Sequence, residues 1–298
     1  MKNLLEFHPI GMGSLLFALG LTLLMSLWTG DVQGAQAQVT ETQPPPPWAR
    51  GIYKSNCAIC HGTNGDGDGP AASMFLMRPR DFRSGKFKLR STPSGSLPTD
   101  DDLLRSVTNG LRWTGMIGRP DLRESDRRAV VQYIKTFSPR FATEKPPPPV
   151  VVPPPPRKTS ELVALGKSLY ADAGCASCHG DTGAGDGPSS QGFKDDWGWS
   201  TRASDLTWRP LKRGSSLQGL YLSIATGFTG TPMPSYGDSL SGDQLWALVY
   251  YLESLVPPER RLYPQQFLGE ERQGWMAIRM GGMMGPGMMG PGMMHRPR

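Results

Sequence analysis

Cysteine and histidine are scarce in this chain of 298 residues, which contains four of each. The four cysteines fall in two pairs of identical spacing, and a histidine follows each pair directly. Proteins of oxidising compartments usually place their cysteines in disulfides. The regular spacing here indicates a different use, at Cys57, Cys60, Cys175 and Cys178.

Apolar residues are also few, at 38% of the chain, whereas glycine and proline are frequent, with 37 and 29 residues. Much of the chain must therefore be loop or linker rather than packed core. The length predicts about two domains, and a large apolar cofactor would allow a loop-rich domain to form a core. Beyond the N-terminal region no segment is apolar enough to span a membrane, since Leu245 to Val256 is short and carries Glu253.

The first 37 residues predict an export signal. Lys2 precedes an apolar run from Ile10 to Trp28, and the small-residue tripeptide Ala35-Gln36-Ala37 follows. This is the order of a signal peptide and its cleavage site. The run is also about long enough to span a bilayer, so a retained N-terminal anchor is the alternative. Both interpretations place the protein in the periplasm, either soluble or associated with the membrane.

The rest of the chain contains an internal repeat of about a hundred residues. The two cysteine pairs stand at an offset of 118, and so do the two Gly-Asp-Gly-Pro stretches that follow them. Later anchors match at an offset of 117, among them Met116 with Met233 and Tyr133 with Tyr250. Self-similarity over this length marks a duplicated domain.

Two proline tracts punctuate the repeat, and the longer one, from Pro146 to Pro156, favours a stiff polyproline II conformation. It acts either as a simple tether or as a spacer that fixes the distance between the domains. The predicted organisation is a signal peptide or anchor at 1–37, a proline-rich linker at 38–47, a first domain at 48–145, a second proline-rich linker at 146–157, a second domain at 158–262 and a Met/Gly/Pro-rich tail at 263–298.

Helical patterns predict an all-α fold. Each half has a helix before its cysteine pair, a short helix in its middle and a longer helix at its end, and no segment alternates like a strand. Ser125 and Ser241 are expected to cap the two longer helices, because an acidic residue follows each in the first turn. The expected ranges are 48–55, 100–107 and 125–137 in the first half, and 160–171, 215–225 and 241–255 in the second.

Each cysteine pair has the form Cys-x-x-Cys-His, which is typical of covalent haem attachment. Two such thiols at the start of a helix reach the two vinyl groups of one haem, and the adjacent histidine supplies an axial nitrogen. A structural zinc site needs four ligands, whereas each half offers three nearby. A redox dithiol would not require the histidine in both copies. We therefore expect two covalently bound haem c groups, attached at Cys57, Cys60, Cys175 and Cys178, with His61 and His179 as axial iron ligands.

The other axial ligand of each iron is expected to be methionine, because no further histidine lies inside either domain. Met233 stands between two prolines, which stiffen an extended loop. Met116 has the matching position in the first half, without flanking prolines. Met74 and Met77 compete with Met116 for this role, and filling a gap in the core is the alternative for each.

On these residues the chain resembles a diheme c-type cytochrome made of two class I cytochrome c domains. The resemblance covers residues 48–140 and 158–256. It implies two tandem domains joined by the proline-rich linker, each burying a haem with histidine and methionine as axial ligands. It also implies that the first and last helices of each domain cross near the haem, at Tyr133 and Tyr250. The stretch from Arg78 to Phe87 is similar to diheme cytochromes attached to respiratory chains.

An iron with two protein ligands has no position for oxygen or peroxide, which leaves outer-sphere electron transfer. We therefore predict an electron carrier of moderately positive potential, without catalytic residues, that relays electrons between exported or membrane-bound respiratory partners. It would act alone or as the haem subunit of an oxidoreductase complex. The alternative is a haem enzyme, a peroxidase or a sulfur-compound oxidase, in which one haem opens at its methionine face. The less constrained loop of Met116 makes the first haem the candidate.

Charge is unevenly divided between the expected domains. Residues 48–145 hold 17 basic and 10 acidic side chains, whereas residues 157–262 hold 10 and 11. This predicts that an acidic redox protein docks on the first domain and a different partner on the second. The basic cluster from Arg78 to Arg90 is expected to pair in part with the propionates of the first haem, or else to form a solvated face. Nucleic acid is not an expected partner of an exported haem protein.

The tail contains eight of the 15 methionines, between Met276 and Met294, in a repeat whose glycines and prolines prevent a helix. We expect disorder there. Binding of Cu(I) by the soft thioethers, a flexible hydrophobic contact arm and an oxidation-sensitive spacer are the alternatives.

Overall fold

The computed structural model describes residues 44–261. The predicted signal or anchor at 1–37, most of the first proline-rich linker and the methionine-rich tail at 263–298 lie outside these residues. Contacts along the described part place it in one unit that begins at Pro44. Below, residues 48–145 are called the first half and residues 158–261 the second half.

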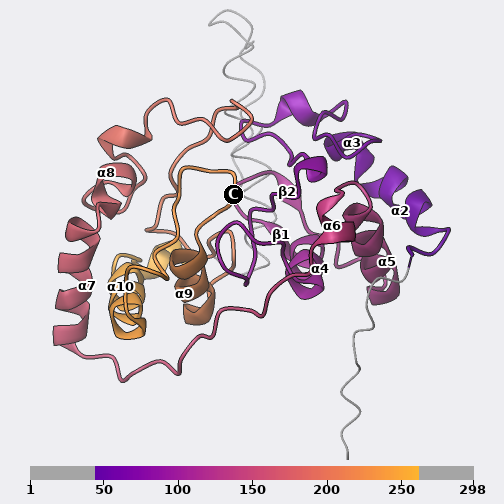
Figure 1. Ribbon diagram of the computed structural model, residues 1–298. Coiled ribbons are helices and arrows are strands. Elements are labelled where there is room, and N and C mark those ends of the chain that lie inside the picture. Colours follow the sequence, from indigo (N-terminus) through magenta and orange to yellow (C-terminus); the bar gives the residue numbers. More distant parts are fainter. Residues whose placement is uncertain (1–43, 262–298) are drawn as a thin grey trace, which may run out of the picture. The chain divides into compact units, whose positions relative to one another are not determined.

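Helices dominate both halves (Figure 1). Apart from isolated bridges, the described residues contain one β pairing, between β1 (Gly110–Leu111) and β2 (Met116–Ile117), which is antiparallel with Leu111 opposite Met116. The prediction of an all-α fold is confirmed as a helix-rich fold, and the small hairpin is an addition that the sequence pattern did not indicate. The helices are α2 (Ala49–Asn56), α3 (Ala58–His61), α4 (Asp100–Asn109), α5 (Glu124–Lys135) and α6 (Arg140–Thr143) in the first half, and α7 (Ser160–Asp172), α8 (Cys175–His179), α9 (Leu217–Thr226) and α10 (Gly242–Ser254) in the second, with the 3-10 turns η1 (Ala72–Met74), η2 (Phe82–Ser84), η3 (Pro188–Ser190) and η4 (Pro258–Arg260).

Side-chain caps fix the start of several helices. Ser241 forms a capping box with Gln244 at α10, as expected for a serine there, and Thr99 forms one with Asp102 at α4. The expected cap at Ser125 is wrong. Because α5 already begins at Glu124, Ser125 has helical backbone angles, and a cap residue must lie outside the helix.

The core of the first half lies between α2 and α5. Tyr53 of α2 is fully buried, and its ring contacts the ring of Tyr133 at a centroid distance of 5.3 Å. Val130 and Val131 of α5 are buried beside it. The expected contact of the first and last helices through Tyr133 is therefore present in this half.

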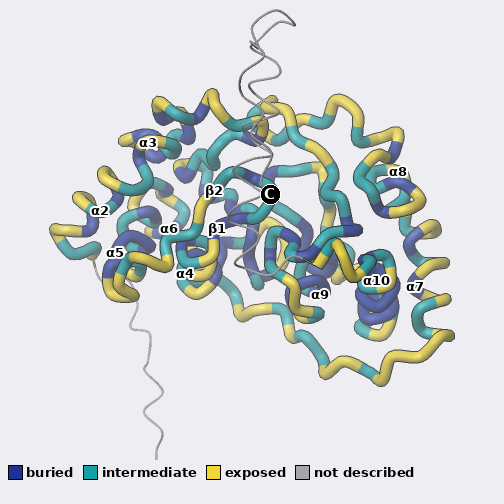
Figure 2. Tube along the Cα trace, turned by 180° about the vertical axis from the view of Figure 1, so that it is seen from behind, coloured by how far each residue is buried: buried dark blue, intermediate teal, exposed yellow. Residues whose placement is uncertain are grey.

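The core of the second half is built on the packing of α7 against α10, which is buried along most of its length (Figures 1 and 2). A Cβ atom on Gly166 of α7 would lie 2.0 Å from the carbonyl oxygen of Ala247. The two helices therefore approach so closely that only glycine fits at this crossing.

The aromatic residue at this crossing is not the expected Tyr250. The ring of Tyr170 on α7 contacts the ring of Tyr251, at a centroid distance of 5.3 Å. Tyr250 instead lies beside Trp246, and its hydroxyl donates a 2.5 Å hydrogen bond to the carbonyl oxygen of Pro156. The repeat register thus differs by one residue at this point, because α10 presents a different side chain to its partner helix.

The proline tract between the halves has no regular secondary structure and contacts both of them. The amide of Val150 donates to the carbonyl oxygen of Ser91 in the first half at 2.8 Å. The indole of Trp246 in the second half donates to the carbonyl oxygen of Pro153 at 3.2 Å. The segment is therefore held against the protein at several points along its length.

None of the helices between residues 44 and 261 has the length and apolar character that crossing a membrane requires.

Candidate haem sites

In each half the first helix leads directly into the short helix that carries the Cys-x-x-Cys-His motif. A tyrosine of the first helix fixes the end of that short helix in the same way in both halves. Tyr53 donates to the carbonyl oxygen of Gly62 at 2.8 Å, and Tyr170 donates to that of Gly180 at 2.7 Å. The motif is thereby anchored to the helix that precedes it.

The two motif histidines are oriented by backbone carbonyl groups. Nδ1 of His61 lies 3.2 Å from the oxygen of Arg80, and Nδ1 of His179 lies 2.9 Å from the oxygen of Ser204. A carbonyl oxygen only accepts, so Nδ1 carries the proton in both rings and the lone pair is on Nε2. Proteins usually orient a metal-binding histidine through such a hydrogen bond from its other ring nitrogen.

Both imidazoles are also kept neutral. Burial lowers the pKa of His61 to about 4, against a smaller upward effect of its bond to the Arg80 carbonyl. Burial lowers the pKa of His179 as well, more than the Ser204 carbonyl raises it. A neutral imidazole with a free Nε2 is the form that binds a metal.

The Gly-Asp-Gly-Pro stretches wrap around the end of each motif. Gly67 and Gly69 donate to the carbonyl oxygens of His61 and Cys60, at 2.9 and 3.1 Å. In the second half Gly185 and Gly187 make the corresponding bonds to the carbonyl oxygens of His179 and Cys178, at 2.8 and 3.2 Å. The glycines are required for close approach, because a Cβ on Gly187 would lie 2.4 Å from a backbone oxygen.

Met233 lies in a tight backbone turn that follows α9. The hydroxyl of Thr231 donates to the carbonyl oxygen of Phe228 at 2.7 Å and accepts from the amide of Met233 at 3.4 Å. The Tyr236 amide then returns to the end of α9 through the carbonyl oxygen of Ile224. The methionine is therefore held through its own backbone.

Met116 has the same backbone arrangement in the first half. Thr114 donates to the carbonyl oxygen of Leu111 at 2.6 Å and accepts from the amide of Met116 at 3.3 Å. Each of these positions corresponds to its counterpart in the second half at the offset of 117. Of the two competitors, Met77 is buried in the core and Met74 is exposed.

A cavity in the second half brings the four predicted residues of that half together. Cys175, Cys178, His179 and Met233 all line it, mostly among apolar side chains. The space inside amounts to about 1150 Å³, part of it open to solvent. The mostly apolar wall and the donor set of two thiols, an imidazole and a thioether fit a haem.

Three of the motif thiols, those of Cys57, Cys60 and Cys175, are held in their neutral form by burial. Burial raises the pKa of Cys57 to about 11, and burial also raises the pKa values of Cys60 and Cys175.

No group of three or more His, Cys, Asp or Glu side chains suited to a metal ion occurs among residues 44–261. A haem held at these positions would supply one-electron redox chemistry, and the protein would supply its attachment, its axial ligands and its burial.

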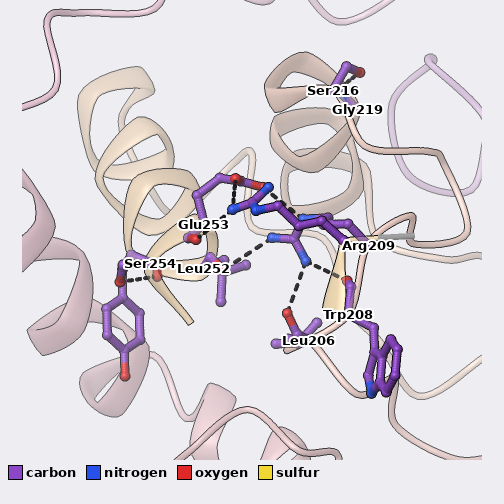
Figure 3. A network of polar contacts seen from close by, with 10 residues as sticks. Leu206, Trp208, Arg209, Ser216, Gly219, Leu252, Glu253 and Ser254 are labelled. Atoms are coloured by element: carbon purple, nitrogen blue, oxygen red, sulfur yellow. Dashed lines mark hydrogen bonds and ion pairs between the residues drawn. The ribbon is translucent and has the colours of Figure 1, made fainter. Parts of the chain in front are cut away.

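A buried arginine braces the wall of this cavity (Figure 3). Arg209 is 1% exposed and pairs with Glu253 at 2.7 Å. It also donates to the carbonyl oxygens of Leu206 and Leu252, at 2.9 and 3.1 Å, and both of these leucines line the cavity. Arg209 therefore joins the loop at Leu206 to the end of α10, both of which contribute to the cavity lining.

Several side chains of the basic cluster of the first half, which the sequence assigned to haem propionates or to a solvated face, have partners in the second half. Arg80 donates to the carbonyl oxygen of Thr229 at 3.3 Å, next to the Met233 turn. Arg90 is buried and donates two bonds to the carbonyl oxygen of Thr226, at 2.9 and 2.7 Å. Lys86 pairs with Asp196 at 2.5 Å. These side chains contact the second half, a use that sequence analysis missed because no local pattern signals it.

Family comparisons match both halves. Residues 163–256 match the family described as cytochrome c, and residues 48–134 match the family described as cytochrome c oxidase, cbb3-type, subunit III. A solved chain of the reducing HAO-like protein complex of Kuenenia stuttgartiensis is similar to 74% of this chain and to 100% of its own length, with 40% sequence identity and a TM-score of 0.71. No curated protein matches the chain.

Each matched family segment contains one complete Cys-x-x-Cys-His motif, and the solved relative extends over both halves. The chain therefore belongs to the diheme c-type cytochromes, with two cytochrome c domains in tandem.

Proposed function

We propose that this cytochrome is an electron relay with two covalently bound haem c groups, each closed on both axial faces. The single observation that carries the proposal is the cavity of the second half, which is lined by both His179 and Met233. An imidazole and a thioether as the two axial ligands leave no position for a substrate at the iron. The function that remains is outer-sphere electron transfer.

In the first half we assign His61 and Met116 as axial ligands, with the haem attached at Cys57 and Cys60. The support is the threonine-based turn around Met116, whose hydrogen bonds repeat those around Met233. Met74 and Met77 have no counterpart of this turn among the described contacts. In the second half the attachment residues are Cys175 and Cys178.

We further propose that the two domains extend over residues 48–145 and 158–262, with the proline tract as the linker that sets their spacing. The protein would act in the periplasm, in a respiratory chain, as an exported or membrane-associated protein. The similar chain that belongs to an HAO-like protein complex supports a role as the haem subunit of a redox complex. An acidic partner is proposed for the first half, on account of its excess of basic residues.

Reaction of the oxidised protein with external ligands tests the proposal. We expect ferric protein to bind cyanide slowly and weakly and not to turn over peroxide, while reduced protein passes electrons rapidly to a redox partner that copurifies with it. Rapid cyanide binding at one haem, or steady turnover of peroxide, would establish the haem enzyme instead.

A further inference from the structure

One residue of the first half reaches the cavity of the second. Lys88 lies between Phe87 and Leu89, both of which are buried in the first half. Its own side chain nevertheless lines the cavity that contains Cys175 and His179. The cavity of the second half is therefore completed by a side chain from the first.

The charges around this cavity are all of one sign. Its lining includes Lys88, Arg202 and Lys212, and no Asp or Glu among the described residues. Arg202 is exposed and can be solvated, whereas both lysines are partly buried. Lys212 donates to the hydroxyl of Ser204 at 2.6 Å, whereas the Lys88 ammonium donates no hydrogen bond and forms no ion pair within residues 44–261.

Both ammonium groups are in surroundings that disfavour their charge. Burial lowers the pKa of Lys88 to about 7, with further lowering by Arg80 and Lys212 and an opposite effect of Asp195. Burial, and then the charge of Arg202, lowers the pKa of Lys212 to about 8. Two cations facing an apolar cavity whose lining contains no carboxylate are a costly arrangement unless a bound group supplies negative charge.

We propose that Lys88 and Lys212 together bind the propionate carboxylates of the haem in the second half, so that the first half supplies part of the cofactor site of the second. The inference rests on the haem proposed above for that half. A haem carries two carboxylates, and the apolar cavity offers them these two ammonium groups as partners. The halves are then coupled through the cofactor as well as through their contacts.

The proposal predicts a reduction potential that depends on a residue of the other half. A positive charge near the haem favours ferrous over ferric iron. Lys88→Met should therefore lower the potential of the second haem, shifting its ferric-to-ferrous ratio about tenfold at fixed ambient potential, which corresponds to 59 mV for one electron. Lys88→Arg, which keeps the charge, should restore most of it.

Lys86→Met is the matched control, since Lys86 is two residues away and also contacts the second half, but pairs with Asp196. Spectroelectrochemical titration of the full-length protein resolves the two one-electron steps, and Met233→His identifies the step of the second half. The proposal is overturned if Lys88→Met shifts that step no more than Lys86→Met does, or shifts both steps equally. If Lys88→Met does not fold, Lys88→Gln, which also removes the charge but keeps a polar side chain, provides the same comparison.

The number of attached haems distinguishes failure of the proposed function from failure of the role of Lys88. The mass of the protein and its reduced absorbance spectrum report how many haems are attached. A protein without haem in the second half contradicts the proposed function itself. A protein with both haems and an unshifted second step contradicts only the role of Lys88.

Discussion

The two halves of this cytochrome share one ligand frame but support it differently. The tyrosine–glycine bond, the histidine–carbonyl bond and the threonine-based methionine turn occur in both. In the first turn Trp113 has a φ of 62°, a conformation that costs a residue with a Cβ about 1–2 kcal/mol. In the second turn Gly230 takes the same place without that cost. The same hydrogen bonds around the methionine therefore occur in both halves, whereas the residues that shape the turn differ.

The second turn also depends on a side chain of the first half. A Cβ on Gly230 would lie 2.5 Å from the guanidinium of Arg80, which shows how closely this arginine contacts the turn. Arg80 also packs over the ring of Trp197, at 4.1 Å from its centroid. Part of the basic excess of the first half therefore stabilises the second half and is not available to an external partner.

Removal of Met116 and Met233, the proposed axial methionines, should have the largest effect on the difference between the halves. Met233→Ala should open the second iron and lower its potential by on the order of 100 mV, because axial ligands set haem potentials over about 0.8 V. Met116→Ala should do the same to the first iron alone. Redox titration and cyanide binding of both variants check this, and an effect of either variant on the wrong haem would contradict the assignment.

Loss of the Arg209 brace should destabilise the second half. Arg209→Met leaves Glu253 partly buried with one partner fewer, and breaking a buried pair typically costs about 3–5 kcal/mol. Arg261→Met removes the exposed partner of the same carboxylate and should cost about 1 kcal/mol or less. Denaturant unfolding monitored by circular dichroism measures both, and equal losses would show that Arg209 has no special role.

Arg80→Met should loosen the Met233 turn without affecting that of Met116. Losing a hydrogen bond from a charged donor costs about 1.5–3 kcal/mol at most, so we expect roughly tenfold tighter cyanide binding at the second haem. Arg83→Met, in the same segment but exposed and paired with Asp81 of its own half, is the control. Cyanide titration of ferric protein distinguishes the two. Unchanged cyanide affinity of the second haem in Arg80→Met would show that the first half does not stabilise the Met233 turn.

Glu253 should make the protein less stable at acidic pH, with a smaller effect than the substitutions above. Burial alone would raise its pKa, but the hydrogen bonds and charges of Arg209 and Arg261 outweigh it, so the pKa is lowered. A carboxyl with a lowered folded pKa contributes stability that is present above about pH 4.5 and lost as the pH falls through the folded value.

Glu253→Gln should therefore flatten the fall in unfolding free energy below about pH 4.5. Glu144→Gln, which changes an exposed carboxylate paired with Arg140, should leave that slope nearly unchanged. Unfolding curves collected between about pH 3 and pH 6 measure the slopes. The same slope in Glu253→Gln and in the unchanged protein would contradict the role given to this carboxylate.

Local signals in the sequence were sufficient for the haem motifs, the repeat and most helix ranges. The motif spacing and the cap at Ser241 depend on neighbouring residues, so they can be read along the chain. Ser125 failed as a cap because α5 starts earlier than its acidic first turn suggested. The prediction that Tyr250 lies at the helix crossing is wrong, because Tyr251 contacts Tyr170 there. A repeat offset does not show which of two neighbouring residues of α10 faces its partner helix.

The contacts between the halves could not be predicted in this way. Arg90 and Thr226 are 136 positions apart, and nothing in either local sequence indicates the other. The sequence places Lys88 in a basic cluster, and only the fold shows that it lines the cavity of the second half. Tertiary packing determines such contacts, and it leaves no local pattern in a single sequence.

The account depends most on a thioether ligand at each iron, and the near-infrared charge-transfer band of ferric haem reports that bond directly. Measured against total haem, the unmodified protein should show two equivalents of the band per chain, with one equivalent remaining in each of Met116→Ala and Met233→Ala. A single equivalent in the unmodified protein, or none, would contradict the relay with two closed irons.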